Sequence, residues 1–203
     1  NIGPGAALPV MEGKAALFKR FADVDAWPVC LDTQDVEEII RTVQIIAPVY
    51  GGINLEDISA PRCFEIEARL RDLLDIPVFH DDQHGTAIVV LAALTNALKL
   101  VKKDLKSTKI VLSGVGAAGT AVARLLIANG AKNIIGFGRD GLIFEDKGED
   151  DPMRKWFVEN CSPGSFRGDL SAAMKGADVF IGLSAPNVLV EADIKSMAKD
   201  AIV

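Results

Sequence analysis

The stretch Lys109-Ile110-Val111-Leu112-Ser113-Gly114-Val115-Gly116-Ala117-Ala118-Gly119 decides the fold of the second half of this chain. Its run from Ile110 to Ser113 predicts a buried strand, and an apolar helical pattern follows from Ala117. Glycines spaced GxGxxG between a strand and a helix are typical of a dinucleotide-binding turn. Gly114 would permit the tight turn, Gly116 would let the backbone approach a pyrophosphate, and Gly119 would let the helix pack closely on the strand.

The expected helix start adds an electrostatic argument to the glycine pattern. A helix that begins at Ala117 would present N–H groups and the positive end of its dipole to the phosphates of a bound nucleotide. The alternative is that the same glycines form only a tight turn. Because both a strand signal and a helix signal flank the motif, we favour nucleotide binding.

The end of the next predicted strand, Asn133 to Phe137, bears on the kind of nucleotide. An acidic residue at this place would bind the ribose 2′-hydroxyl of NAD. The place is held by Gly138, and Arg139 follows with a guanidinium that can bind a 2′-phosphate. The sequence therefore favours NADP over NAD, although Asp140 argues the other way and a solvated turn cation is the alternative for Arg139.

Strand and helix signals alternate along the whole chain, which predicts an α/β fold with mostly parallel sheets. In the first half we expect a short strand at Ala26 to Leu31. A long helix, roughly His84 to Lys102, is apolar almost all round and is expected to be deeply buried. We place the domain boundary near Asp82-Gln83, which gives domains over residues 1–82 and 83–203, the second of them Rossmann-like.

The composition excludes several classes of protein. The chain has 203 residues, 49% hydrophobic and 25% charged, as in ordinary globular proteins, and its formal net charge of −6 disfavours nucleic acid as a partner. The longest apolar stretch, Ala87 to Leu94, is shorter than the about 20 residues that a membrane span needs. No secretory signal opens the chain, and Cys30, Cys63 and Cys161 lie far apart, which favours reduced thiols and a cytoplasmic protein.

Two pairs of carboxylates follow predicted strands: Glu56-Asp57 and, one strand–helix unit later, Asp81-Asp82. The carboxyl ends of parallel strands meet at one edge of a sheet, so these acids are candidates for a shared site. An all-oxygen site in a chain with two histidines would take Mg²⁺ or Mn²⁺ rather than structural zinc. Adjacent acids on a strand point to opposite faces, so both can bind only where the strand gives way to a loop. Helix caps or surface charges are the alternatives.

Lys14 lies inside an otherwise apolar predicted helix, Val10 to Ala22. Near a divalent cation its pKa would fall, and it could then act as a general base near neutral pH. The alternative is an ordinary solvated lysine. His84 is expected at a helix start or in the core rather than as a metal ligand.

Taken together, these segments resemble the malic enzymes, and in particular the smaller prokaryotic type. The matching stretches span essentially the whole chain and are Asn1–Lys14, Gly51–Phe64, Pro77–Ala87, Gly114–Gly119 and Gly182–Asn187. The second and third are long and specific, and they make a metal site the preferred interpretation of the carboxylates. The resemblance implies a substrate- and metal-binding domain followed by an NAD(P)-binding domain, both of them incomplete.

The activity that the resemblance implies is the metal-dependent oxidative decarboxylation of (S)-malate to pyruvate and CO₂, with NAD or NADP as the hydride acceptor. By motif, Lys14 matches the general base of the family, and Asp81 matches a residue that holds and tunes this lysine. Glu56, Asp57 and Asp82 match the ligands of Mg²⁺ or Mn²⁺.

The cofactor site is implied in the same way. The backbone of Val115 to Ala118 would cradle the cofactor phosphates, and Ser184 and Asn187 would line the ribose or nicotinamide side. The cofactor-binding residues that we expect are Gly114, Val115, Gly116, Ala117, Ala118, Gly119, Arg139, Ser184 and Asn187.

The resemblance also implies what this chain lacks. The general acid of the family is a tyrosine well upstream of the Lys14 segment, whereas we expect Tyr50 only to pack. Neither end reads as a natural terminus, so we expect a piece of a longer protein, with the acid outside this chain and the isolated piece without activity. Malic enzymes are dimers or larger, which implies a homodimer or a higher homo-oligomer that acts on malate.

Other functions stay open. Malolactic conversion of malate to lactate uses the same metal and cofactor. An amino-acid or hydroxy-acid dehydrogenase could share the Rossmann half but needs no carboxylate metal site. A non-catalytic nucleotide- or metal-binding remnant would have no use for Lys14 as a base.

Overall fold

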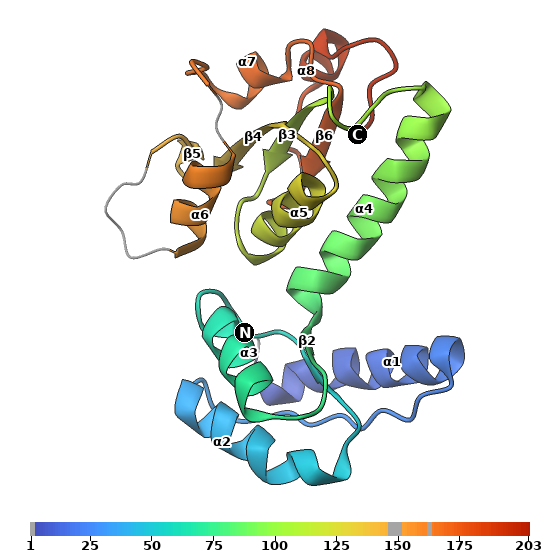
Figure 1. The fold of residues 1–203 in the computed structure, drawn as a ribbon, viewed down its shortest axis with the longest axis vertical. Coiled ribbons are helices and arrows are strands. Elements are labelled where there is room, and N and C mark those ends of the chain that lie inside the picture. The colour runs from blue at the N-terminus through green and yellow to red at the C-terminus, as the bar shows by residue number, and fades with distance from the viewer. Residues whose placement is uncertain (1–2, 146–151, 162–163) are drawn as a thin grey trace. The chain divides into compact units, whose positions relative to one another are not determined.

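The computed structural model describes residues 3–145, 152–161 and 164–203. The first two residues of the matching stretch Asn1–Lys14 thus lie outside the described residues. The chain forms two compact units, Asn1–Asp81 and Asp82–Val203 (Figure 1). Both contain parallel strands and helices, which confirms the predicted α/β class.

The first unit packs helices against a small parallel sheet. Its main hydrophobic cluster comes from α2, α3 and β1 and consists of Ile39, Ile40, Val43, Leu55, Ile66 and Leu70. Asp35 caps α2 by accepting a hydrogen bond from the backbone N–H of Glu38. The elements are α1 (Pro4–Ala22), α2 (Val36–Ile46), the 3-10 helix η1 (Ala47–Val49), β1 (Ile53–Leu55), α3 (Arg62–Leu73) and β2 (Val78–His80).

Helix α1 contributes no buried residue among those described. It begins earlier than the sequence predicts, because Pro4 occupies its first turn, where a missing N–H costs nothing. It ends on Asp23 in the left-handed region, with φ 52°. Several of its apolar side chains, such as Leu17 and Phe21, are exposed.

The predicted strand at Ala26 to Leu31 is wrong. This segment lacks any assigned strand, although its side chains alternate between half-buried Ala26, Pro28 and Cys30 and exposed Trp27 and Val29. The alternation is that of a strand, but a strand also needs a hydrogen-bonded neighbour. The pairing that the structure records for β1 is with β2.

The second unit is a Rossmann-like sheet with helices on both faces. Among the described residues, its strands lie in the order β5-β4-β3-β6, with β4, β3 and β6 parallel and β5 antiparallel to β4. The elements are α4 (Asp81–Val101), β3 (Lys109–Ser113), α5 (Ala117–Ala128), β4 (Asn133–Gly138), β5 (Gly141–Leu142), α6 (Pro152–Asn160), α7 (Leu170–Met174), β6 (Val179–Gly182) and α8 (Glu191–Ser196).

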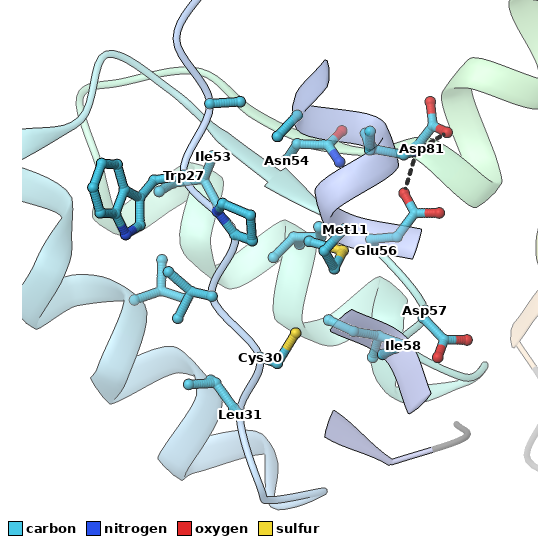
Figure 2. A pocket seen from close by; sticks show the side chains of 18 of the residues that line it. Met11, Trp27, Cys30, Leu31, Ile53, Asn54, Glu56, Asp57, Ile58 and Asp81 are labelled. Atoms are coloured by element: carbon cyan, nitrogen blue, oxygen red, sulfur yellow. Dashed lines mark hydrogen bonds and ion pairs between the residues drawn. The ribbon is translucent and has the colours of Figure 1, made fainter. Parts of the chain in front are cut away.

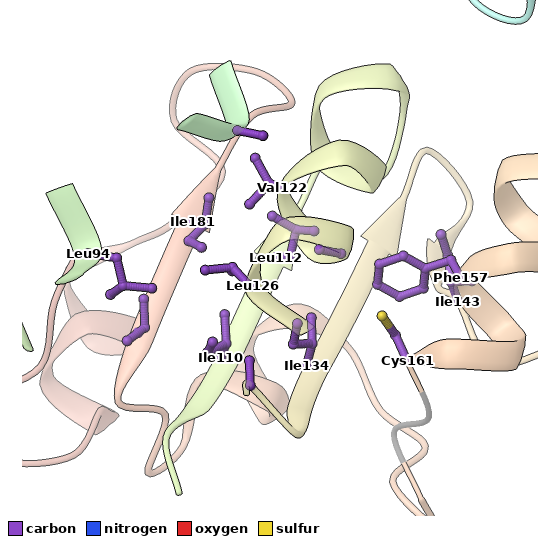
Figure 3. Packing of buried hydrophobic residues seen from close by; sticks show 14 of the residues in the cluster. Leu94, Ile110, Leu112, Val122, Leu126, Ile134, Ile143, Phe157, Cys161 and Ile181 are labelled. Carbon is purple, nitrogen blue, oxygen red and sulfur yellow. The ribbon is translucent and has the colours of Figure 1, made fainter. Parts of the chain in front are cut away.

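Side chains of successive residues in β3 enter different cores, as the twofold period of a strand requires. Ile110 and Leu112 pack with Leu126 of α5 and Phe157 of α6 (Figure 3). Val111 points into a second cluster, which α7 and the segment before α8 complete. The carboxyl ends of the parallel strands therefore lie at one edge of a sheet covered on both faces.

Helix α4 differs from the sequence prediction in both extent and burial. It begins at Asp81, so Asp81 and Asp82 lie in its first turn rather than in a loop. Leu94 and Leu98 enter the core, but Ile88 and Leu100 are exposed, so the expectation of deep burial is wrong. The sequence of this helix is apolar almost all round, so its pattern does not distinguish the buried face from the exposed face.

Helix α4 bears on the expectation that the chain has no apolar segment of membrane-spanning length. By length and composition alone, it is long enough and apolar enough to cross a membrane. One such helix is weak support for a membrane segment, because helices in the cores of soluble proteins have the same length and composition.

Candidate active site

The two strands of the first unit bring two of the predicted carboxylates together. β1 and β2 are parallel neighbours, and Leu55 pairs with His80 at their carboxyl ends. Glu56 directly follows Leu55, and Asp81 directly follows His80, so both acids lie at the same edge of the sheet. In Figure 2 their carboxylates face one another.

Lys14 of α1 joins these two acids. Its Nζ donates hydrogen bonds to Glu56 Oε2 and to Asp81 Oδ2, both at 2.5 Å. Burial lowers the pKa of Lys14, but the hydrogen bonds to Asp81 and Glu56 and their negative charges outweigh burial, so the pKa is raised. In this arrangement the lysine is an ammonium, the opposite of what a general base requires.

The other two predicted metal ligands lie beside this cluster in the sequence. Asp57 follows Glu56 beyond the end of β1, where its backbone turns with φ 55°. The strand has therefore given way to a loop before both acids, which is the condition for the pair to share a ligand. Asp82 is the second residue of α4 and the first of the second unit.

No group of three or more His, Cys, Asp and Glu side chains within the described residues is already arranged to hold a metal ion. Lys14 instead supplies the positive charge between Glu56 and Asp81. The donors are nevertheless of one chemical kind, since Glu56, Asp57 and Asp82 offer carboxylate oxygens alone. This set fits Mg²⁺ or Mn²⁺, which prefer oxygen ligands.

A cavity of about 1070 Å³ opens next to Lys14, Glu56 and Asp81. All of its lining residues belong to the first unit and come from the α1 region, the extended segment after it, α2, the β1 and β2 regions and the start of α4. Figure 2 shows Met11, Cys30 and Leu31 as part of its apolar wall. A small substrate bound there would meet charged groups at one end and apolar side chains elsewhere.

Asn54 is a residue of this cavity that the sequence analysis missed. It lies on β1, two residues before Glu56, and both residues line the cavity. Its amide nitrogen is buried and has no hydrogen-bond partner among the described residues. The feature of the sequence that could have identified Asn54 is its polar side chain between the apolar residues Ile53 and Leu55.

The glycine turn of the second unit has the geometry that the motif predicts. Gly114 has φ 104°, and a Cβ on it would lie 2.7 Å from the backbone of Leu183. A Cβ on Gly119 would lie 2.2 Å from the carbonyl oxygen of Gly114. A Cβ on Gly116, in contrast, would meet nothing within 4 Å, so the backbone is open to an approaching ligand there. Val115 donates its N–H to the carbonyl of Phe137 at 3.2 Å.

This turn leads directly into α5, whose first residues are Ala117 and Ala118. The first N–H groups of a helix have no partner within the helix and favour a bound anion. The predicted phosphate-binding residues therefore gather at the carboxyl end of β3, at the start of a helix.

The remaining predicted cofactor residues follow the neighbouring strands. Arg139 and Asp140 form the exposed tip of the hairpin between β4 and β5, in which Gly138 pairs with Gly141. Ser184 follows β6, and its Oγ lies 2.9 Å from Oγ of Ser113.

Asn187 lies three residues beyond Ser184 in a turn, with φ 60°. Ser113 was not predicted as a site residue. The motif identifies the end of its strand but not the strand that lies beside it.

Family models match both units. The model described as "Malic enzyme, N-terminal domain" matches residues 1–71, and "Malic enzyme, NAD binding domain" matches residues 83–201. The chain belongs to the malic enzyme family. This membership agrees with the resemblance drawn from the sequence motifs.

Individual members of the family resemble the chain over all of its length. It is 60% identical to an NAD-dependent malic enzyme of Geobacillus stearothermophilus, covering 100% of this chain and 42% of that protein. It is 50% identical to a bifunctional malic/malolactic enzyme of Bacillus subtilis (strain 168), covering 100% of this chain and 50% of that protein. The chain thus spans about half the length, or less, of these malic enzymes.

A solved structure gives the same result. The NAD-dependent malic enzyme from Thermotoga maritima superposes with a TM-score of 0.93 at 48% sequence identity, covering 100% of this chain and 54% of that one.

Proposed function

We propose that this chain carries the base, the cation ligands and the dinucleotide-binding turn of an enzyme that oxidatively decarboxylates (S)-malate to pyruvate and CO₂. The observation that carries the proposal is Lys14 held by Glu56 and Asp81 at the edge of a cavity. Membership of the malic enzyme family supports it. NAD or NADP would accept the hydride from C2 of malate.

Glu56, Asp57 and Asp82 would hold Mg²⁺ or Mn²⁺, because they offer the oxygen ligands that these ions prefer. A bound divalent ion would supply Lewis acidity toward the C2 oxygen and would stabilise the negative charge that develops as CO₂ leaves.

Lys14 would accept the C2 hydroxyl proton at Nζ. Two carboxylates raise the pKa of Lys14. Glu56 is itself a proposed ligand of the cation, and Asp81 precedes the proposed ligand Asp82 in the sequence. When a cation neutralises their charge, burial is left as the main influence, and burial lowers the pKa of a lysine. The neutral amine form of Lys14, which a general base requires, would then be easier to reach.

Asp81 would position this lysine. Its hydrogen bond fixes Nζ at the wall of the cavity, and its own place is fixed by the start of α4. The resemblance assigns the protonation of C3 to an upstream tyrosine, so the complete reaction would need a group that Lys14, Asp81 and the cation ligands do not supply.

Arg139 favours NADP as the preferred cofactor. It lies at the tip of the hairpin that follows β4, where a 2′-phosphate would be recognised, and its exposed guanidinium is available to pair with it. Relatives of this chain include both NAD- and NADP-dependent malic enzymes, so the proposal stands on Arg139 and Gly138.

Malolactic conversion of malate to lactate is the second candidate, since the Bacillus subtilis relative is named as a bifunctional malic/malolactic enzyme. By the resemblance, we also propose a homodimer or larger homo-oligomer. The cysteine spacing favours reduced thiols and hence a cytoplasmic location. Sedimentation of the complete protein would test the oligomeric state.

The test is cofactor reduction with (S)-malate and Mn²⁺, followed by absorbance in the complete protein, with NADP and NAD in separate assays. Pyruvate formation that a chelator abolishes would support oxidative decarboxylation. Lactate formation without net cofactor reduction would support the malolactic reaction instead. Cofactor binding with neither product would identify a non-catalytic binding module.

A further inference from the structure

The sheet of the second unit reverses its strand order beside β3. The chain passes from β3 to β4 on one side and later returns to place β6 on the other side of β3. In open parallel sheets, ligands bind in the crevice at the carboxyl ends of the strands where the order reverses. That crevice lies between the ends of β3 and β6.

Two serines occupy the ends of these two strands. Ser113 is the last residue of β3, and Ser184 comes two residues after the end of β6. Their hydroxyl oxygens lie 2.9 Å apart, within hydrogen-bonding distance. The Leu183 N–H also donates to the carbonyl of Ser113 at 2.7 Å. The serine pair is therefore an extra link between the two strand ends, formed by side chains rather than by the backbone ladder.

The two serines differ in accessibility. Ser113 is 6% exposed, whereas Ser184 is exposed. A hydroxyl has one donor and two acceptor positions, so one mutual hydrogen bond leaves Ser184 able to bond a ligand as well. Gly114 fits tightly beside this pair, since a Cβ there would lie 2.7 Å from the N atom of Ser184.

We propose that Ser113 is a positioning residue for the dinucleotide site. Its buried hydroxyl fixes the rotamer of Ser184, and the remaining hydrogen-bonding capacity of Ser184 is thereby directed to the ribose–nicotinamide half of a dinucleotide in the crevice. Ser113 does not touch the ligand and acts through Ser184. The inference rests on the proposed dinucleotide binding and adds to it a residue whose effect depends on a second one.

The experiment is a double-mutant cycle on the complete protein, with the dissociation constants of NADP and NAD measured directly by calorimetry. We expect Ser113→Ala and Ser184→Ala each to weaken binding about three- to tenfold, the range of one ordinary hydrogen bond. The double variant should bind no more weakly than Ser184→Ala alone, because Ser113 then has nothing left to position. Ser113→Thr, which keeps the hydroxyl, should restore much of the affinity.

Ser196→Ala is the matched control. The Ser196 hydroxyl also makes one hydrogen bond, to the carbonyl of Asp193 at 2.7 Å, and it lies in α8. Ser196→Ala should lose about as much thermal stability as Ser113→Ala, and it should bind the dinucleotide with the affinity of the wild type. In steady-state assays, Ser113→Ala should raise KM for the dinucleotide and leave KM for malate unchanged.

The outcomes separate this inference from the proposed function. Unchanged affinity in Ser113→Ala, or losses from the two single variants that add in the double variant, would overturn the positioning role while leaving dinucleotide binding intact. A wild-type protein that binds neither NADP nor NAD would instead remove the proposed cofactor site on which the inference rests.

Discussion

Lys14 and Asp81 lie 67 positions apart in the sequence and meet in an ion pair of 2.5 Å. Lys14→Ala removes the group that would accept the C2 hydroxyl proton. We expect kcat for malate oxidation to fall by about 10²- to 10⁴-fold, the range for loss of a general base. The Kd of the dinucleotide should not change, because the proposed role of Lys14 is to accept a proton from malate and not to bind the dinucleotide.

Lys19→Ala is the control, since Lys19 lies on the same helix and pairs with exposed Asp23 and Asp25. It should leave both constants unchanged. A Lys14→Ala protein that retains most of its kcat, or that loses dinucleotide affinity, would contradict the role as base.

Asp57→Asn tests the cation site, because the substitution keeps the size of the side chain and removes its charge. We expect Mn²⁺ affinity, measured directly by calorimetry, to fall at least about tenfold, and malate oxidation to fall with it. Asp72→Asn, at an exposed position of α3, should change neither. Normal Mn²⁺ binding by Asp57→Asn would exclude Asp57 as a ligand.

Gly116 and Gly119 should respond differently to the same substitution. Gly119→Ala places a Cβ 2.2 Å from the carbonyl oxygen of Gly114, so α5 must shift and the free energy of unfolding should fall by about 1–3 kcal/mol. Gly116→Ala meets nothing within 4 Å, so stability should stay within about 1 kcal/mol of wild type.

Dinucleotide affinity should nevertheless fall in Gly116→Ala, since the new methyl group occupies the side from which a pyrophosphate approaches. Urea unfolding and calorimetric titration of the two variants make the comparison. Equal stability losses, or normal dinucleotide binding by Gly116→Ala, would contradict the assigned roles.

Arg139→Ala tests the cofactor preference. Loss of a guanidinium that pairs with a 2′-phosphate should raise KM for NADP about tenfold or more and leave KM for NAD nearly unchanged. Arg41→Ala removes an exposed arginine of the first unit and serves as the control. Equal changes for the two cofactors would mean that Arg139 is a solvated turn residue.

Asp178 gives a prediction about stability in acid. Burial raises the pKa of its carboxyl, but hydrogen bonds from Lys103 Nζ at 2.8 Å and from the Lys109 N–H at 2.9 Å outweigh burial, so the pKa is lowered. A lowered pKa in the folded state stabilises the protein above the unfolded value of about 4, and this contribution is lost as the pH falls through the folded pKa.

Asp178→Asn should therefore be less stable than wild type at pH 7, and the difference should shrink as the pH falls below about 4. Urea unfolding at a series of pH values measures it, with Asp72→Asn as the exposed control. A difference that stays constant over this range would mean that the charge of Asp178 does not stabilise the fold.

Most of the helices and strands could be predicted from patterns within short stretches of the sequence. The strand, the glycine turn and the helix around Gly114 were predictable because their signals lie within one short stretch. The segment from Ala26 to Leu31 was not, because alternation identifies an extended chain but not its partner. The exposure of Ile88 on α4 was missed for a related reason, since burial depends on what else packs against a helix.

The candidate site also has residues whose place could be predicted from the sequence and contacts that could not. Glu56 and Asp81 could be predicted at one sheet edge, because the carboxyl ends of parallel strands meet there. The approach of Lys14 from α1 depends on how a helix lies over the sheet, and spacing cannot give that. The contact between Ser113 and Ser184 depends on the order of strands in the sheet, which no motif in either segment states.

The three cysteines differ in burial, so their rates of reaction with a thiol reagent should differ, and Cys30 can report on the cavity of the first unit. Cys63 is fully buried, and burial raises the pKa of the Cys161 thiol to about 12, so both should react slowly with alkylating reagents. Cys30 is half-buried and lines the cavity beside Lys14. A thiol-specific fluorophore should label Cys30 first, and protection from labelling would read the occupancy of the cavity without any turnover.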